Sequence, residues 1–318
     1  MHPDTLRRYV TIANQIAAAS ANKLNMANAA YYEAVLLNRL GKIDSAFIVI
    51  EKNLQLPDEK TYQEIKNNFA LLKGNLLIRN NRQKEAIETC LALLHIADAN
   101  KDAALAVKAK TVLGWANMEL GQNRESLKWS LDAIDEWQRT DTSVQIAVTF
   151  NNTAAVYNEL QKNDSAEIYV RRAIQIAQRE QNLTSLTNGY YIYSDICVAL
   201  GDSNKAEALL KEGLKIRRQI GDVFYIVSDI AQLGVFYANN NEPAKGIEAV
   251  KEGIDIAEQN NLYAKLPFLY SALAKNYKAA GDMVNYTNAL NKIIVLKDSL
   301  YAKNSAEALA EMQTRYEV

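Results

Sequence analysis

The sequence is organised around a period of 40 residues. One position recurs at this spacing seven times, and it is occupied by Gly41, Asn81, Gly121, Gln161, Gly201, Asn241 and Gly281. Seven residues earlier a small residue recurs, at Ala34, Gly74, Gly114, Ala154, Ser194, Gly234 and Ala274. A fixed period of this length is typical of stacked supersecondary units, each of which buries its apolar face against its neighbours. The chain is therefore expected to form a solenoid rather than a globule built around one active centre.

The recurring glycine and asparagine position marks the end of a helix. Helices commonly stop at a residue in the left-handed conformation, which glycine adopts most easily and asparagine next. Gln161 departs from this pattern, and we expect the nearby Asn163 to take that turn. Asp202 and Asp282 are expected to cap the helices that follow, as is Glu242 in front of a proline. Each period thus corresponds to a helix, a tight turn, a second helix and another turn.

The recurring small residues are expected where the two helices of a unit touch. A bulky side chain in place of Ala34 or Gly234 would hold the two antiparallel helices apart. The matching core position on the second helix is apolar except for one serine. It is occupied by Ile50, Cys90, Ser130, Val170, Leu210, Val250 and Leu290. We expect these positions to form the contact between the two helices of each unit.

Several repeat positions carry residues that are typical of one family. Leucine–glycine pairs occur at 40–41, 113–114, 120–121, 200–201 and 233–234, tyrosine occurs at 157, 237 and 277, and alanine occurs at 46, 86, 166 and 206. Because of these residues the chain resembles the tetratricopeptide family, whose usual period is about 34 residues. The resemblance covers nearly the whole chain. The longer period here implies helices of about 17 residues. The resemblance implies an all-α, right-handed superhelical solenoid whose first helices line a concave groove.

The repeat divides the sequence into three segments. Residues 1–26 are expected to hold the N-terminal helix of an incomplete repeat, because Leu6 and Val10 are in phase with the later second helices. Residues 27–299 are expected to form seven 40-residue helical hairpins of the tetratricopeptide type. Residues 300–318 are expected to form a C-terminal helix, for which the start of a signalling coiled coil is one interpretation.

The C-terminal segment carries a second resemblance. Residues 297–300 have the sequence KDSL, and a polar helical stretch then leads to AEMQTRYE at 310–317. These features are similar to the junction in Bacteroidetes-type membrane sensors. There, a tetratricopeptide array outside the membrane is followed by a KDSL turn, a coiled coil, one membrane span and a histidine kinase or DNA-binding output. The resemblance implies that this chain is the periplasmic sensor portion of a two-component regulator.

The same segment has a spacing that fits self-association. Leu309, Met312 and Tyr316 are spaced as in the seam of a helix dimer. A plain helix that caps the end of the solenoid explains this spacing equally well. Both alternatives remain open from the sequence.

The composition argues against several functions and structural features. The 36 basic and 37 acidic residues are interspersed and give a net charge of −1, whereas a nucleic-acid surface needs clustered lysine and arginine. No run of about 18 apolar residues is present that could span a membrane, and no secretory signal is visible. Cys90 and Cys197 lie three units apart, too far for a disulfide. We expect both to be buried free thiols.

Groups suited to catalysis are sparse in this sequence. Histidine occurs only at positions 2 and 95. No histidine, cysteine or carboxylate cluster has metal-ligand spacing, and no glycine-rich phosphate loop is present. We therefore predict no enzymatic activity and no cofactor or metal. Gln15 or Gln145 could be nominated for the water-directing role of a related class of phosphatases, but a solvated glutamine is far more common.

The tetratricopeptide resemblance implies which residues face a ligand. In such stacks the second, fifth, ninth and twelfth positions of each repeat, here counted from Ala27, line the concave face. The resulting candidates are Asn28, Tyr31, Asn68, Asn75, Lys108, Trp115, Asn151, Asn158, Asn188, Tyr191 and Asp195. Asparagine amides can pair with any peptide backbone, and the aromatic residues add apolar contact. We expect a peptide or protein ligand; a carboxylate clamp is not matched, because the second basic residue is missing.

Three functions are compatible with these features. The first is the ligand-sensing region of a membrane-anchored two-component regulator, located in the periplasm. The second is a stand-alone scaffold or peptide-binding adaptor, either cytoplasmic or periplasmic. The third is a helical phosphatase-type regulator that resembles peptide-controlled quorum-sensing proteins. The C-terminal segment discriminates between the first two.

Overall fold

The computed structural model describes the backbone of residues 3–20, 22–140 and 144–316, and the side chains among them from residue 4 to residue 302. Helices and the turns between them account for these residues, and no strand occurs in the described ranges. The predicted all-α class is confirmed. The chain divides into two compact units, Met1–Asp222 and Val223–Val318, and each is described by itself.

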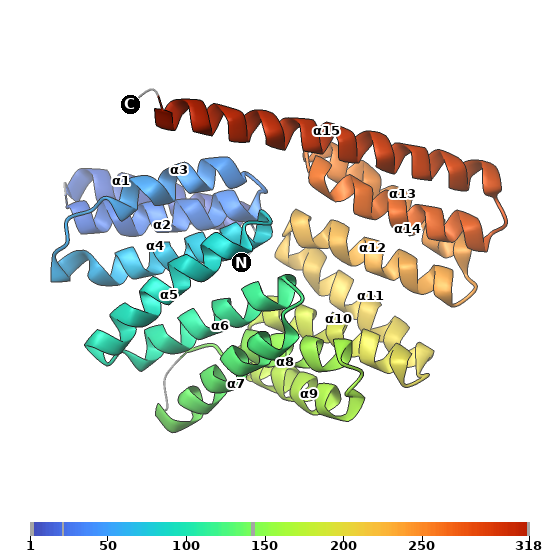
Figure 1. Cartoon of the computed structure of the whole chain (residues 1–318), viewed down its shortest axis with the longest axis horizontal. Coiled ribbons are helices and arrows are strands. Elements are labelled where there is room, and N and C mark those ends of the chain that lie inside the picture. Colours follow the sequence, from blue (N-terminus) through green and yellow to red (C-terminus); the bar gives the residue numbers. More distant parts are fainter. Residues whose placement is uncertain (1–2, 21, 141–143, 317–318) are drawn as a thin grey trace. The chain divides into compact units, whose positions relative to one another are not determined.

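The first unit consists of a leading helix and five helical hairpins (Figure 1). The leading helix is α1 (Pro3–Ser20), whose Leu6 and Val10 are buried against Leu36, as their phase with the later second helices predicts. The hairpins are α2 (Lys23–Arg39) with α3 (Ile43–Leu54), α4 (Lys60–Arg79) with α5 (Gln83–Asn100), α6 (Ala103–Glu119) with α7 (Asn123–Thr140), α8 (Ala147–Glu159) with α9 (Asn163–Arg179), and α10 (Leu183–Ala199) with α11 (Ser203–Ile220).

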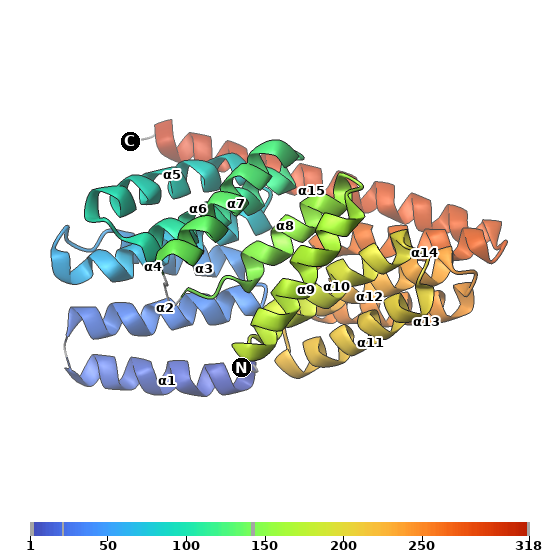
Figure 2. The same cartoon turned by 90° about the horizontal axis from the view of Figure 1, so that it is seen from below.

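The hairpins of the first unit stack through their first helices. Each first helix contacts its own second helix and also the first helix of the next hairpin, along the series α2, α4, α6, α8 and α10. Figure 2 shows the helices of this unit from below. Consecutive first helices therefore form a continuous layer.

The second unit contains two hairpins and ends in a long helix. Its elements are α12 (Val223–Asn239), α13 (Pro243–Gln259), the short 3-10 helix η1 (Tyr263–Lys265), α14 (Leu266–Ala279) and α15 (Met283–Tyr316). α15 continues through residues 297–300, which are therefore helical. The turn that the resemblance to membrane sensors implied for the KDSL sequence is not present. The stretch 283–316 contains neither glycine nor proline, the residues that most often end a helix. The proposed seam of Leu309, Met312 and Tyr316 lies outside the described side chains.

Every predicted helix-ending position adopts the left-handed conformation. The φ angle is positive at all seven positions of the 40-residue series, from 58° at Asn81 and Gln161 to 83° at Gly201. The expectation that Asn163 replaces Gln161 is wrong, because Asn163 begins α9. The Lys162 amide donates to the Tyr157 carbonyl at 2.9 Å, the hydrogen bond that closes such a helix end. The left-handed helix end therefore recurs every 40 residues, even at Gln161, where the residue is neither glycine nor asparagine.

Replacing Gln161 with glycine is expected to stabilise the first unit. Glycine removes the cost of a Cβ atom in the left-handed region, so we expect about 0.5–1 kcal/mol of added stability. Urea unfolding followed by tryptophan fluorescence measures the change. Gln175→Gly is the matched control at an exposed position inside α9, where glycine should instead cost about 1 kcal/mol. Equal effects of the two substitutions would contradict the prediction.

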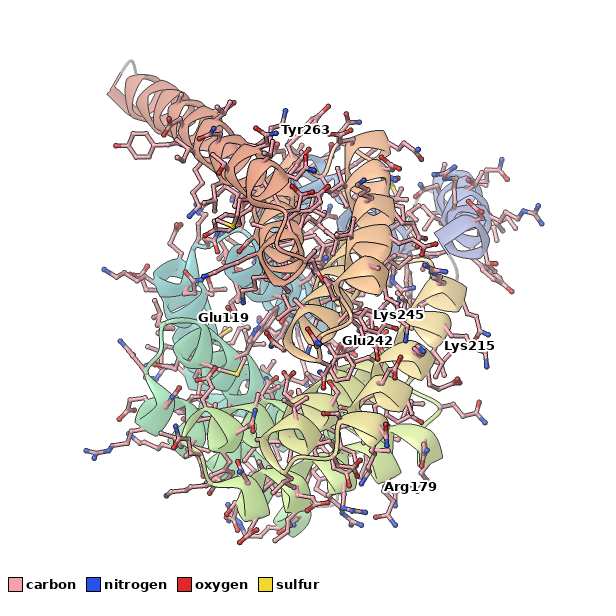
Figure 3. The ribbon with its side chains drawn as sticks, turned by 90° about the vertical axis from the view of Figure 1, so that its right-hand side faces the viewer. Glu119, Arg179, Lys215, Glu242, Lys245 and Tyr263 are labelled. Atoms are coloured by element: carbon pink, nitrogen blue, oxygen red, sulfur yellow. The ribbon has the colours of Figure 1, made fainter. Side chains whose placement is uncertain are left out.

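The predicted helix caps are confirmed in two of three places. Asp202 accepts a hydrogen bond from the Lys205 amide at 3.1 Å, and Asp282 accepts one from the Asn285 amide at 3.1 Å. Glu242 makes no such cap and instead pairs with Lys245, which lies beside it (Figure 3). Glutamate has one more methylene than aspartate, and N-caps favour the shorter side chains.

The small residues face the predicted core positions. A Cβ atom on Gly74, Gly114 or Gly234 would lie 3.0, 2.3 or 2.2 Å from an atom of Cys90, Ser130 or Val250, respectively. Each pair belongs to the two helices of one hairpin. The closest approach of these helices therefore depends on the absence of a side chain at the glycine.

Leu290 does not occupy the predicted core position in α15. Its side chain is 37% exposed, and the neighbouring Ala289 is buried instead. At this turn of α15 the buried residue thus lies one position earlier than in the repeat. The prediction for Leu290 is wrong for this reason.

Both cysteines are free and buried, as predicted. Burial raises the pKa of Cys90 from 9.0 to about 12. The folded thiol keeps its proton up to that pH, whereas a solvated thiol ionises near pH 9. The contribution of Cys90 to stability should therefore be constant below pH 9 and decline as the pH rises above it.

Iodoacetamide at pH 8 is expected to leave Cys90 unmodified in the native protein and to modify it in 6 M guanidinium. Rapid modification of Cys90 in the native protein would contradict this.

Candidate functional site

The first helices of the first unit enclose a cavity of about 350 Å³, which we call the inner pocket. It is bounded by α2, α4, α6 and α8 and by the segment that precedes α8. Five of the predicted binding residues line it, namely Tyr31, Asn68, Asn75, Lys108 and Trp115. The remaining lining residues are Leu71, Leu72, Thr111, Val112, Val144, Gln145, Val148 and Asn152. The structure thus brings together candidates from three successive hairpins.

The aromatic residues of the inner pocket are held in place by their neighbours. The Tyr31 ring packs edge-on against the buried Phe69 ring, with 5.6 Å between the centroids. Burial, with a smaller contribution from Tyr32, raises the pKa of Tyr31, so its hydroxyl stays protonated at neutral pH. The Trp115 Nε1 donates to Glu119 at 2.9 Å, and this bond orients the indole. Both rings are therefore prearranged for contact.

The inner pocket carries a positive charge and several amides. Lys108 is its one charged lining residue, and no carboxylate lines it. Lys108 is exposed and forms no ion pair within the described part of the chain. The side-chain amides come from Asn68, Asn75, Gln145 and Asn152. Amides both donate and accept hydrogen bonds, so this lining suits a peptide backbone beside an acidic group.

Two predicted residues are buried away from any ligand. Asn151 is 1% exposed, and its Nδ2 donates to the Ser185 carbonyl at 2.8 Å. Tyr191 is 6% exposed, packs over Gly213 and donates its hydroxyl to the Leu210 carbonyl at 3.4 Å. Both occupy the fifth position of their repeats, which in the earlier hairpins lines the inner pocket. The prediction is wrong for them, because in α8 and α10 this position is buried against neighbouring helices.

Four further candidates lie outside the inner pocket. Asn188 accepts a hydrogen bond from Arg217 Nη2 at 2.7 Å, so its carbonyl oxygen has a structural partner. Asn28 and Asp195 are exposed, and Asn158 is half-buried. None of these four residues lines the inner pocket. Their role in binding a ligand stays a prediction.

Sequence reasoning missed the segment that precedes α8. Val144 and Gln145 line the inner pocket from a non-helical stretch, so no repeat position could have identified them. Asn182 Nδ2 donates to Gln145 Oε1 at 3.0 Å and fixes its amide. The available signal was the polar junction at 140–141, which marks an irregular connection. Gln145 is thus not the helical glutamine that a phosphatase role would use.

Among the residues that the structure describes, no group of three or more histidine, cysteine, aspartate or glutamate side chains could hold a metal ion. None of their helices combines the length and apolar character needed to cross a membrane.

Part of the sequence matches a known family model. Residues 145–219, which cover the hairpins α8–α9 and α10–α11, match the family described as Tetratricopeptide repeat. This agrees with the resemblance drawn from the repeat positions. No curated protein matches the chain significantly.

The fold is similar to several solved structures. A Rap protein complexed with competence and sporulation factor has a TM-score of 0.60 and 14% identity, covering 94% of this chain and 97% of that one. Aspartyl phosphate phosphatase F from Bacillus subtilis has a TM-score of 0.60 and 17% identity, covering 89% and 73%. NprR in complex with its cognate peptide NprX has a TM-score of 0.55 and 14% identity, covering 86% and 81%. The chain is therefore an all-α, tetratricopeptide-like solenoid.

Proposed function

We propose that this chain is a non-enzymatic binding module whose inner pocket holds an extended peptide segment. The observation that carries the proposal is the convergence of Tyr31, Asn68, Asn75, Lys108 and Trp115 on one cavity. Concave surfaces of repeat stacks are their usual binding surfaces. Two of the similar structures contain a bound factor or peptide according to their descriptions, which is consistent with this role.

The lining defines the chemistry of the expected ligand. The aromatic rings of Tyr31 and Trp115 would contact an apolar side chain of the peptide. The amides of Asn68 and Asn75 would pair with its backbone, which does not depend on its sequence. Lys108 would attract an acidic residue, and this contribution should weaken with added salt.

A selection from random linear peptides tests the proposal. Phage-displayed 12-residue peptides are enriched on the wild-type chain, and their dissociation constants are measured with synthetic copies. The double variant Asn75→Ala/Trp115→Ala should weaken binding at least about 100-fold, because aromatic anchors dominate such interfaces. Lys108→Glu should weaken acidic peptides selectively.

The control for this experiment is Asn28→Ala. Asn28 is a predicted candidate on α2 that does not line the inner pocket, so its loss should leave the affinity unchanged. Circular dichroism confirms that each variant is folded. Full affinity in Asn75→Ala/Trp115→Ala would refute the inner pocket as the binding site.

We also propose that the module is the periplasmic sensing region of a membrane-anchored two-component regulator. The support is the resemblance of residues 297–317 to the junction of such sensors, although α15 lacks the turn of that junction. Binding in the inner pocket would then alter the geometry of α15. Reading the source gene beyond Val318 tests this: a polar heptad helix, about 20 apolar residues and an output domain would support it. An immediate stop codon would instead favour a stand-alone adaptor, cytoplasmic or periplasmic.

A phosphatase-type regulator is the third proposal. It is supported by the fold likeness to aspartyl phosphate phosphatase F, at 17% identity. Its test is binding to a phosphorylated response-regulator receiver domain and the rate at which the aspartyl phosphate decays. An unchanged decay rate would exclude this role.

A further inference from the structure

A second, larger cavity lies on the side of the second helices. It has a volume of about 960 Å³ and lies between α7 and α9, with Phe150 of α8 and Tyr193 of α10 at its floor. We call it the outer cleft. It shares no lining residue with the inner pocket. The outer cleft is therefore a separate feature of the first unit.

The walls of the outer cleft have the spacing of a helix-binding groove. Its lining residues on α7 are Leu131, Ile134, Asp135 and Gln138, and those on α9 are Ile168, Tyr169, Arg171, Arg172, Ile174, Gln175 and Gln178. On α7 they fall at the spacing i, i+3, i+4 and i+7, and on α9 they add the neighbouring positions of the same turns, so that each wall is one face of a helix, broader on α9. The α9 stripe runs from Ile168 to Gln178, a rise of about 15 Å along the helix. Two parallel stripes facing one gap match the shape of a third, amphipathic helix.

The composition of the outer cleft is that of a protein interface. Its lining contains three aromatic residues, four aliphatic residues and two arginines, but neither lysine nor glutamate. Aromatic residues and arginine are enriched in interfaces, whereas lysine and glutamate are depleted. Ile168 is 68% exposed at the edge of the cleft. Such an exposed apolar side chain is suited to contact with a partner.

The charges of the outer cleft indicate the charge of the partner. Asp135 pairs with Arg139 at 3.0 Å, and Arg171 pairs with Glu167 at 2.6 Å. Arg172 donates to the Gln175 amide at 2.8 Å and pairs with no carboxylate among the described residues. The cleft thus has one cation that is not neutralised, on the α9 wall. A partner with an acidic residue at this wall would be complementary.

We propose that the outer cleft docks an amphipathic helix of a partner protein, with its apolar stripe on Leu131 and Ile168 and an acidic residue beside Arg172. The bound helix would lie along α7 and α9. Its apolar residues would follow the spacing i, i+3, i+4 and i+7. This interaction does not depend on the proposed function of the inner pocket.

A display selection with helical peptides tests this proposal. The probe is a library of 18-residue peptides with fixed leucine or isoleucine at these four spacings and randomised flanking positions. Enriched peptides should carry aspartate or glutamate beside the apolar stripe. Ile168→Asp and Arg172→Glu should each weaken their binding at least about tenfold. A peptide with lysine in place of its acidic residue should regain affinity for Arg172→Glu.

Two matched controls keep the test specific. Ile48→Asp changes an isoleucine that is 71% exposed at the same repeat position of α3, and Arg179→Glu changes an arginine of α9 outside the cleft (Figure 3). Neither should affect binding. The proposal is overturned if no peptide is enriched on the wild type above the Ile168→Asp/Arg172→Glu variant, or if Asn75→Ala/Trp115→Ala abolishes binding while the cleft variants do not.

Discussion

The substitution Gly234→Leu is expected to lower the free energy of unfolding of the second unit by about 1–3 kcal/mol. Even the first atom of a side chain at this position would lie 2.2 Å from Val250 Cγ2 and 3.7 Å from the Gly246 carbonyl. The backbone of α13 would have to move away from α12 to make room. Hydrogen exchange of peptides from α12 to α14, with urea unfolding followed by circular dichroism, measures the loss.

Two variants separate overpacking from other effects of Gly234→Leu. Ala244→Leu adds a similar bulk at an exposed position of α13 and should change stability by less than about 0.5 kcal/mol. Gly234→Ala combined with Val250→Ala should be more stable than Gly234→Ala alone, because it removes the clashing methyl group. An unchanged unfolding midpoint and slope in Gly234→Leu would show that the two helices do not meet at this residue.

The substitution Phe69→Ala is expected to cost the first unit about 3–5 kcal/mol. Phe69 is fully buried in the core formed by α2, α3 and α4, and it supports the Tyr31 ring at the wall of the inner pocket. Its removal would leave a cavity that the surrounding helices can fill only in part. The effect should therefore extend to the affinity of the inner pocket.

Tryptophan fluorescence is the suitable measurement for Phe69→Ala, because Trp115, Trp129 and Trp137 all lie in the first unit. Phe69→Leu should cost less than Phe69→Ala, since it leaves a smaller cavity. Tyr32→Ala removes a ring that is 53% exposed and should change stability far less. Equal losses in Phe69→Ala and Tyr32→Ala would contradict the burial argument.

The repeat by itself determined the helical hairpins and their contacts. Backbone conformation at a helix end and steric room at a helix crossing are local requirements, so Gly201 and Gly234 could be assigned from spacing alone. The same spacing placed Tyr31, Asn75 and Trp115 on one side of the stack, and these three line the inner pocket. Gln161 adopts the left-handed conformation because the hydrogen bonds at the helix end impose it. The residue type alone does not predict this conformation, since glutamine rarely adopts it.

Only the tertiary structure decided which residues of a repeat position are accessible. Asn151 and Tyr31 share the fifth repeat position, but Asn151 is buried where consecutive first helices pack, whereas Tyr31 borders a cavity. The outer cleft was likewise not predictable, because the gap between α7 and α9 depends on how far successive second helices diverge. A period fixes the direction in which each residue points, but the distances between helices are set by the packing of all their side chains.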